Sequence, residues 1–118
     1  MGTRAQVHIV DTGIYLYQHY DGYHLPTIVR NAMIRGKDRL SDDEYLTRII
    51  FSEMVRDDID GSTGYGIGKN QHSDIEYLVT VDVAKQRITV YHMTWNGLTI
   101  QIWVYTFKQF MESTIMEW

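Results

Sequence analysis

The residues best suited to chemistry lie close together near the start of the chain. They are Tyr17, His19, Asp21, Tyr23 and His24. A carboxylate can orient an imidazole, and an imidazole exchanges protons near neutral pH. The segment therefore predicts either a ligand-binding or catalytic site, or a turn in which tyrosine and histidine rings are half-buried packing. We favour packing over catalysis here, but not over ligand binding.

A second group of candidates accompanies a glycine-rich stretch. Residues 61–72 hold four of the nine glycines, Tyr65 lies among them, and His72 and Asp74 come at the end. Glycine-rich backbone can present N–H groups to an anion. However, the stretch lacks the Lys-Ser/Thr of a P-loop, and we expect a strand after it, not a helix. It predicts either a lid over an anionic ligand or simply a mobile surface loop.

The histidines do not predict a metal centre. The chain has five histidines and no cysteine, and no two histidines are spaced i, i+4 as on one face of a helix. Thiolate sites are excluded and imidazole sites are poorly supported. The Gly-x-Ser-x-Gly elbow of many serine hydrolases is also missing. We predict no metal site and no cofactor.

Acidic residues suggest one way to bind a partner. The chain carries 15 acidic and 11 basic residues, a net charge of −4, and acids cluster at 42–44 and at Asp57, Asp58 and Asp60. A nucleic-acid binder normally carries a basic face, so we predict no direct nucleic-acid binding. The clusters indicate either a solvated surface, which we favour, or a patch that meets a basic partner.

Aromatic residues late in the chain suggest a second way in which the protein could bind a partner. Trp103 and Tyr105 alternate with apolar residues, which predicts either a recognition face or a second layer of core under a terminal helix. Trp118 ends the chain with no polar residue after it. It predicts either a helix that closes the core, which we favour, or a surface for a partner or a second copy.

Hydrophobic periodicity predicts the elements that position these residues. Strands are expected over residues 5–10, 14–20, 75–82, 87–93 and 98–105. Helices are expected over 26–35, over 42–58 after a capping box from Ser41 to Glu44, and from a second capping box at Thr106 to the last residue. We predict one α+β domain over residues 1–118: an antiparallel sheet of about five strands, in the order ββ-αα-βββ-α, with helices mainly on one face.

Composition narrows the class of protein. Hydrophobic residues make up 44% of the chain and charged residues 22%, as in globular domains. No apolar run approaches the ~20 residues that a membrane helix needs, and we see no secretory signal. The lack of cysteine fits a reducing cytosol. We expect a cytoplasmic protein that does not enter a membrane.

Three segments of the chain are similar to segments of a known group of proteins. Gly2-Thr3-Arg4-Ala5, residues 17–23, and residues 64–67 with 72–77 resemble a group of small phage and prophage proteins. Those proteins open with a Gly-Thr-Arg strand and carry a His-Trp-Asp-Gly-Tyr-Pro-like segment. This chain departs from them at Tyr20, where the group has Trp, and at His24, where it has Pro. From Trp95 onward there is no counterpart, and no catalytic role carries over.

The resemblance implies a phage or mobile-element accessory protein that acts in the cytosol of its host. Our first hypothesis is a non-enzymatic binder of a host protein, such as an inhibitor of a defence system that resembles anti-CRISPR proteins. The second is a small ligand-binding protein or enzyme that uses His19 and Asp21 on a nucleotide-like anion, with the glycine-rich stretch as a lid. The third is a structural homo-oligomer, for example a homodimer formed through the C-terminal helix. Whether the chain is an enzyme stays open, and we favour a binder.

Overall fold

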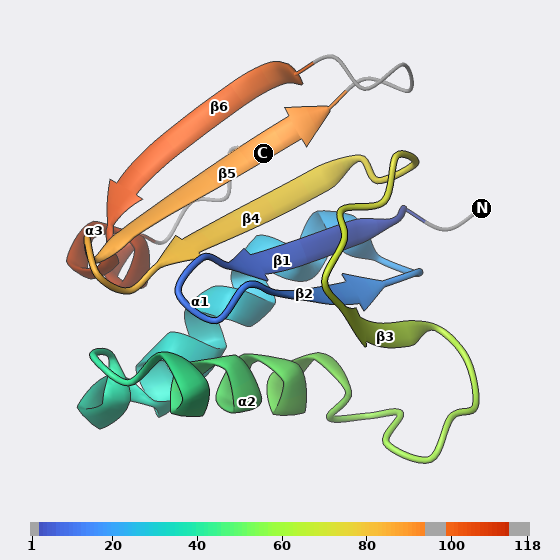
Figure 1. Cartoon of the computed structure of the whole chain (residues 1–118), viewed down its shortest axis with the longest axis horizontal. Helices are drawn as coiled ribbons and strands as arrows, with labels where there is room; N and C mark the ends of the chain where they lie inside the picture. The colour runs from blue at the N-terminus through green and yellow to red at the C-terminus, as the bar shows by residue number, and fades with distance from the viewer. Residues whose placement is uncertain (1–2, 94–98, 114–118) are drawn as a thin grey trace.

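One β-sheet carries the helices on a single face, so the chain forms two layers (Figure 1). The computed structural model describes residues 3–93 and 99–113. The strands are β1 (Ala5–Ile9), β2 (Ile14–Gln18), β3 (Tyr65–Gly68), β4 (Tyr77–Asp82), β5 (Arg87–Met93) and β6 (Thr99–Thr106). The helices are α1 (Leu25–Arg35), α2 (Asp43–Met54) and α3 (Phe107–Glu112), with 3₁₀ turns at Gly22–His24 and Lys37–Arg39.

The predicted α+β class is confirmed, but the sheet differs from the expected one. Its order within the described residues is β3-β2-β1-β4-β5-β6, with six strands instead of about five. It is also mixed, because β1 and β4 run parallel while all the other neighbours are antiparallel. Parallel neighbours need a long crossover connection, and here α1, α2 and β3 supply it.

The unexpected strand is β3. Gly66 pairs with Tyr17 and Gly68 with Tyr15, so part of the predicted loop over 61–72 extends the sheet as an edge strand. Glycine has low β propensity and no side chain that would reveal an alternating pattern. Hydrophobic periodicity therefore could not identify this strand.

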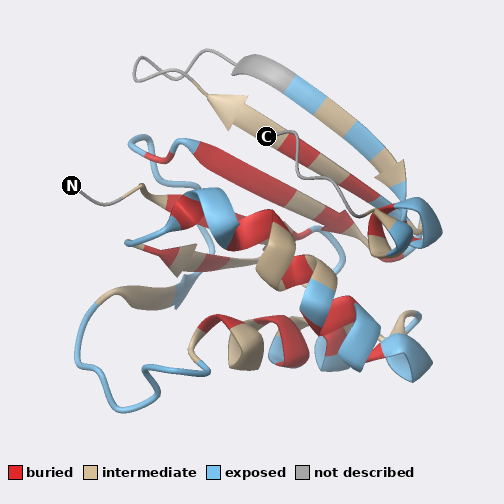
Figure 2. Cartoon of the chain, turned by 180° about the vertical axis from the view of Figure 1, so that it is seen from behind, coloured by how far each residue is buried: buried red, intermediate tan, exposed pale blue. Residues whose placement is uncertain are grey.

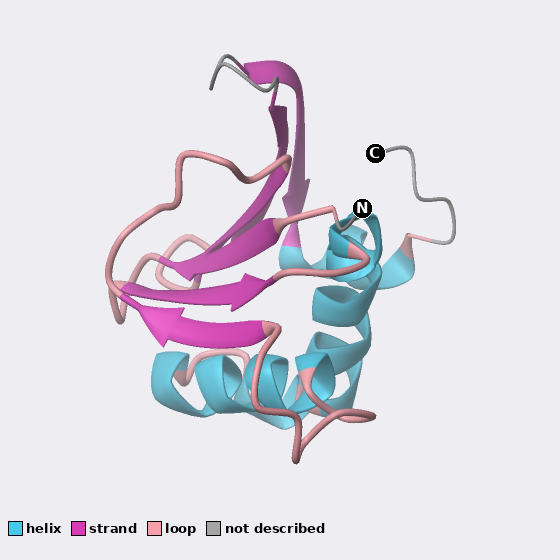
Figure 3. Ribbon diagram, turned by 90° about the vertical axis from the view of Figure 1, so that its right-hand side faces the viewer, coloured by secondary structure: helices cyan, strands magenta, loops and turns pink. Residues whose placement is uncertain are grey.

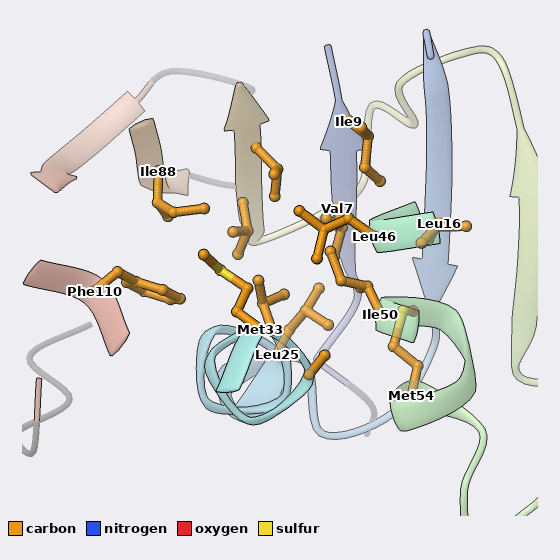
Figure 4. Packing of buried hydrophobic residues seen from close by; sticks show 14 of the residues in the cluster. Val7, Ile9, Leu16, Leu25, Met33, Leu46, Ile50, Met54, Ile88 and Phe110 are labelled. Atoms are coloured by element: carbon orange, nitrogen blue, oxygen red, sulfur yellow. The ribbon is translucent and has the colours of Figure 1, made fainter. Parts of the chain in front are cut away.

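The core lies between the sheet and the helices. Val7 of β1 is paired with Leu16 of β2 on one side and Val79 of β4 on the other, and all three side chains are buried. Side chains of α1 and α2, among them Met33 and Ile50, pack against this layer (Figure 4). Figure 2 shows that buried residues alternate with exposed ones along α1 and α2, and that β4 is buried along most of its length.

The second helix begins and ends differently from our prediction. Its N-cap is Asp42, whose carboxylate accepts a hydrogen bond from the backbone N–H of Tyr45 at 3.2 Å. The predicted capping box at Ser41 is therefore wrong by one residue. The helix ends at Met54, short of residue 58. Three aspartates follow its C-terminus, where the helix dipole disfavours negative charge.

The third helix begins as predicted. Thr106 Oγ1 accepts from the backbone N–H of Gln109 at 3.1 Å, and the Gln109 side chain accepts from the N–H of Thr106 at 2.9 Å. Phe107 and Phe110 are buried in the core. The helix ends at Glu112, because Ser113 is already extended, so it does not run on as a single helix. Trp118 lies outside the described residues. Among the described residues, no helix is long and apolar enough to cross a membrane.

Candidate functional site

The sheet divides the predicted site residues into two groups. Successive side chains of a strand point to opposite faces, so Tyr17 and His19 point away from the helices, while Gln18 points toward them. In Figure 3 the helices lie below and to the right of the twisted sheet, and the loop that leads to β4 lies on its left. The face without helices is called the open face below.

A polar cluster on the open face brings together residues that are far apart in sequence. Tyr17 Oη lies 2.9 Å from His19 Nδ1, and the Tyr17 and His72 rings are 4.5 Å apart. Arg4 Nε lies 3.4 Å from His19 Nδ1 and 3.5 Å from Asp74 Oδ2. Since the Arg4 N–H can only donate, His19 Nδ1 is the acceptor in its contact with Arg4.

The Tyr17 hydroxyl in this cluster remains a proton donor. Burial, followed by the nearby Asp74 carboxylate, raises the pKa of Tyr17 above its ordinary value. A tyrosine with a raised pKa stays protonated at neutral pH, so it does not supply a phenolate base or nucleophile. Its geometry fits an orienting hydrogen bond to His19.

Gln6 holds the loop after β3 against the open face, and the loop crosses β2 and β1 (Figure 1). The side chain of Gln6 is only 1% exposed. Its Nε2 donates to the Asn70 carbonyl at 3.2 Å, and its Oε1 accepts from the backbone N–H of His72 at 2.8 Å. The cavity left beneath the loop, between Tyr17 and His72, holds 100 Å³. Ligand sites measure about 300–1,000 Å³, so this cavity is too small for a nucleotide.

A larger cavity lies on the helix side of the sheet. It holds 710 Å³ and lies between the end of β2, the start of α1, the end of α2 and the start of β3. Of the residues singled out in the sequence, four line it: Asp21, His24, Asp57 and Tyr65. We call this cavity the acidic cleft. His19 and His72 are not among its lining residues, so the expected pair of His19 and Asp21 is divided between the two faces.

The turn after β2 is built to hold Asp21 at the cleft. Gln18 Nε2 donates to the carbonyls of Tyr20 at 2.7 Å and Asp21 at 3.3 Å. Gly22 donates its N–H to the carbonyl of Thr3 at 2.8 Å. Asp21 adopts the left-handed conformation, with φ 55° and ψ 35°, which aspartate tolerates better than most residues.

Gln18 is the functional candidate that sequence reasoning missed. Its side chain is 3% exposed and lines the cleft. Because the two carbonyls fix its amide nitrogen, Oε1 is the end left to accept, and it has no hydrogen-bond partner among the described residues. A buried acceptor without a donor costs about 1–3 kcal/mol. A glutamine on the core face of a strand was the available signal.

The carboxylates of the cleft differ in their pairing. Glu53 accepts from Arg35 Nη1, and its second oxygen accepts from Arg56 Nη1 at 3.2 Å, so two guanidinium groups more than compensate its charge. Asp21 and Asp57 form no ion pair with any described residue. Burial raises the pKa of Tyr65, and the charges of Asp58, Asp21 and Asp57 raise it further. The Tyr65 hydroxyl therefore lies within electrostatic reach of three carboxylates.

The remaining candidates lie outside the cleft lining. Tyr23 is exposed and packs on His24, with ring centroids 4.3 Å apart, and Asp60 is exposed. Trp103 and Tyr105 are half-buried and pack against the core on the helix side. Within residues 3–93 and 99–113, no group of three or more His, Asp or Glu side chains is placed to hold a metal ion.

Comparison with known proteins did not identify a relative of this chain. No protein family, curated protein or solved structure matches the chain. The resemblance to phage and prophage proteins therefore stays a prediction, and function is inferred below from the chemistry of the acidic cleft.

Proposed function

We propose that the protein is a non-enzymatic binding protein that holds a positively charged segment of a partner protein in the acidic cleft. The observation that carries this proposal is that Gln18, whose buried Oε1 has no hydrogen-bond partner among the described residues, lines a cavity that also presents the carboxylates of Asp21 and Asp57, neither of which is in an ion pair. An N–H group that bears positive charge would satisfy the amide oxygen and both carboxylates.

The charges of the cleft favour a cation over an anion. A cationic group would gain charge-assisted hydrogen bonds with Asp21 and Asp57, which are about twice as strong as neutral ones. The net charge of −4 adds long-range attraction that speeds the approach of a basic partner. A nucleotide-like anion would be repelled by the same carboxylates, and this disfavours the second hypothesis from the sequence.

The arrangement supports binding more than catalysis. A general acid or base must lie within hydrogen-bonding reach of its substrate. His19 is on the open face, occupied by Tyr17 and Arg4, while Asp21 lines the cleft on the other side. The two side chains do not form a shared catalytic pair.

A partner of different sequence is better supported than a second copy. The apolar residues Phe107 and Phe110 of α3 are used inside the chain, and Lys108, Gln109 and Glu112 are its exposed residues. This leaves the described part of the C-terminal helix little apolar surface for a homodimer. On the resemblance to phage and prophage proteins, we propose a host protein as the partner, met in the host cytosol, and a defence-system protein as the first class to test.

The experiment is a binding titration with labelled 12-residue peptides of basic, neutral and acidic composition, followed by fluorescence anisotropy at two salt concentrations. We expect the wild type to bind only the basic peptides, more weakly at high salt. The double variant Asp21→Asn/Asp57→Asn should bind them at least about tenfold more weakly. Asparagine also tolerates the left-handed conformation of residue 21, so the turn should be kept.

The matched control is Asp38→Asn/Glu112→Gln. It removes the same charge from two exposed positions that do not line the cleft. Its affinity should stay close to that of the wild type. If no basic peptide binds, or if both double variants lose the same affinity, the cleft is not the binding site and the proposal fails.

A further inference from the structure

We infer that the acidic cleft is a subsite for arginine, and that it takes a guanidinium group in preference to the ammonium group of lysine. This inference rests on the proposed function and adds the identity of the side chain. Four features of the cleft carry it: the depth of its amide acceptor, the positions of its carboxylates, its aromatic walls and the place of its own arginine.

The depth of Gln18 is the first feature. Its Oε1 is buried, so a donor that reaches it must first lose its hydration shell. An ammonium group is compact and strongly hydrated, whereas a guanidinium group is delocalised and holds water more weakly. The guanidinium group therefore reaches a buried oxygen at a smaller desolvation cost.

The position of the acceptors is the second feature. Asp21 belongs to the turn after β2, Asp57 follows α2, and Gln18 is the last residue of β2. A ligand that meets all three must direct donors toward separate elements. Guanidinium carries five N–H donors in one plane, while ammonium carries three on a single nitrogen. The guanidinium fork can therefore meet acceptors from two elements at once, whereas an ammonium group directs all its donors from one nitrogen.

Aromatic rings form the third feature. Tyr20 and Tyr65 line the cleft together with the carboxylates, and Tyr20 is 57% exposed. A planar guanidinium stacks on such rings, and the attraction is greater when the contact excludes water. The chain itself makes this kind of contact elsewhere, since the Arg39 guanidinium lies 4.5 Å from the centre of the Tyr45 ring.

The fourth feature is that the chain's own arginine at the cleft leaves the acceptors available. Arg56 lines the cavity, but its Nη1 is bound to Glu53 at 3.2 Å. It does not pair with Asp21 or Asp57. An incoming guanidinium therefore meets two carboxylates that are still uncompensated.

The test compares three small probes that differ only in the side chain of one residue. They are the capped tripeptides acetyl-Gly-Arg-Gly-amide, its lysine analogue and its citrulline analogue, the last being uncharged but nearly the same shape as arginine. Binding to the full chain is followed by two-dimensional NMR titration. We expect the arginine probe to bind at least about fivefold more tightly than the lysine probe, and the citrulline probe to bind weakest.

Variants connect this preference to the cleft. Gln18→Met removes the buried acceptor and should bring the arginine-to-lysine ratio close to one. Since Gln18 also supports the turn, Tyr20→Leu provides a second route: this exposed ring can be removed with the fold intact, and the ratio should fall about twofold to fivefold. The control Asp38→Asn, at an exposed position outside the cleft lining, should leave the ratio unchanged.

The outcomes separate the inference from the function on which it rests. Equal binding of the arginine and lysine probes overturns the arginine subsite while leaving a general cation-binding cleft in place. A ratio that stays unchanged in Tyr20→Leu, and in Gln18→Met if that variant folds, also overturns it. If neither charged probe binds and basic peptides fail as well, the proposed function falls together with the inference.

Discussion

Two buried glutamines organise the candidate sites, and neither was among the candidates taken from the sequence. Gln6 fixes the loop over the open face, and Gln18 shapes the turn that holds Asp21. A hydrophobic pattern assigns polar strand residues to solvent, so it cannot show that Gln6 is buried under a loop that comes 64 to 66 residues later in the chain. The tyrosine, histidine and aspartate candidates were easier to find, because their chemistry is visible in the residue type itself.

Gly22 is the residue where the cleft is least tolerant of change. A Cβ added at this position would lie 2.4 Å from the carbonyl oxygen of Thr3 and 2.8 Å from the Cβ of Ala5. The first obstacle is backbone just before β1 and the second is the short side chain of the first residue of β1, so the turn itself must shift. We predict that Gly22→Ala lowers the free energy of unfolding by about 1–3 kcal/mol, as overpacking does, and weakens binding at the cleft because Asp21 moves.

Urea denaturation and the peptide titration measure the two effects. Gly68→Ala is the matched control: Gly68 lies at the sheet edge, and an added Cβ there would meet no atom within 4 Å. We expect it to change stability by less than about 0.5 kcal/mol. If Gly22→Ala proved as stable as Gly68→Ala, the prediction would be wrong. The turn after β2 would then accommodate a Cβ at residue 22 without loss of stability.

At the scale of elements, the sequence predicted those that have a regular hydrophobic period. Helix α1 begins one residue before the predicted position 26, and β5 has the predicted bounds. The pattern could not predict β3, whose alternate residues are glycines, nor the pairing of β1 with β4. Pairing depends on where the chain returns after α1 and α2, and this is decided by packing across the whole sheet.

The N-terminus of α2 allows a test of which residue caps this helix, Asp42 or the predicted Ser41. The Asp42 carboxylate satisfies one of the N–H groups that the first helical turn leaves unpaired, and its charge suits the positive end of the dipole. We predict that Asp42→Ala lowers the free energy of unfolding by about 1 kcal/mol. Thermal and urea unfolding measure it.

Ser41 supplies the comparison, because it is the residue that the sequence pattern proposed as the cap. It is exposed and precedes the true N-cap, so Ser41→Ala should change stability by less than about 0.5 kcal/mol. Binding at the cleft should be unaffected in both variants, since the cleft lies at the other end of α2, near Met54. A larger loss in Ser41→Ala than in Asp42→Ala would return the cap to Ser41.

Over the whole molecule, the two edges of the sheet have different surroundings. The cleft lies beside β3 at one edge, and α3 packs against β5, β6 and α1 near the other. Trp103 and Tyr105 pack toward the helices, whereas Ile102 and Val104 are exposed on the open face. The sequence pattern predicted that β6 has two different faces. It left open whether Trp103 and Tyr105 form a recognition face or a second layer of the core. The position of α3 decides between these two roles, and the hydrophobic pattern does not give that position.

This separation predicts that stability can be lowered without loss of binding. Phe110 is fully buried, its ring centre lies 5.5 Å from that of Tyr105, and its side chain points toward Met33 of α1 (Figure 4). Phe110→Ala would leave a cavity between α3, the sheet and α1. We predict a loss of about 3–5 kcal/mol in the free energy of unfolding, measured in urea.

Below the unfolding transition, the same variant should bind basic peptides with the affinity of the wild type, because no residue of α3 lines the cleft. Val104→Ala is the control: Val104 is 60% exposed, so the loss should stay below about 1 kcal/mol. If folded Phe110→Ala bound basic peptides much more weakly than Val104→Ala, the two edges of the sheet would be coupled. The cleft would then depend on the packing of the whole core, and not only on the turn, the helix end and the edge strand that surround it.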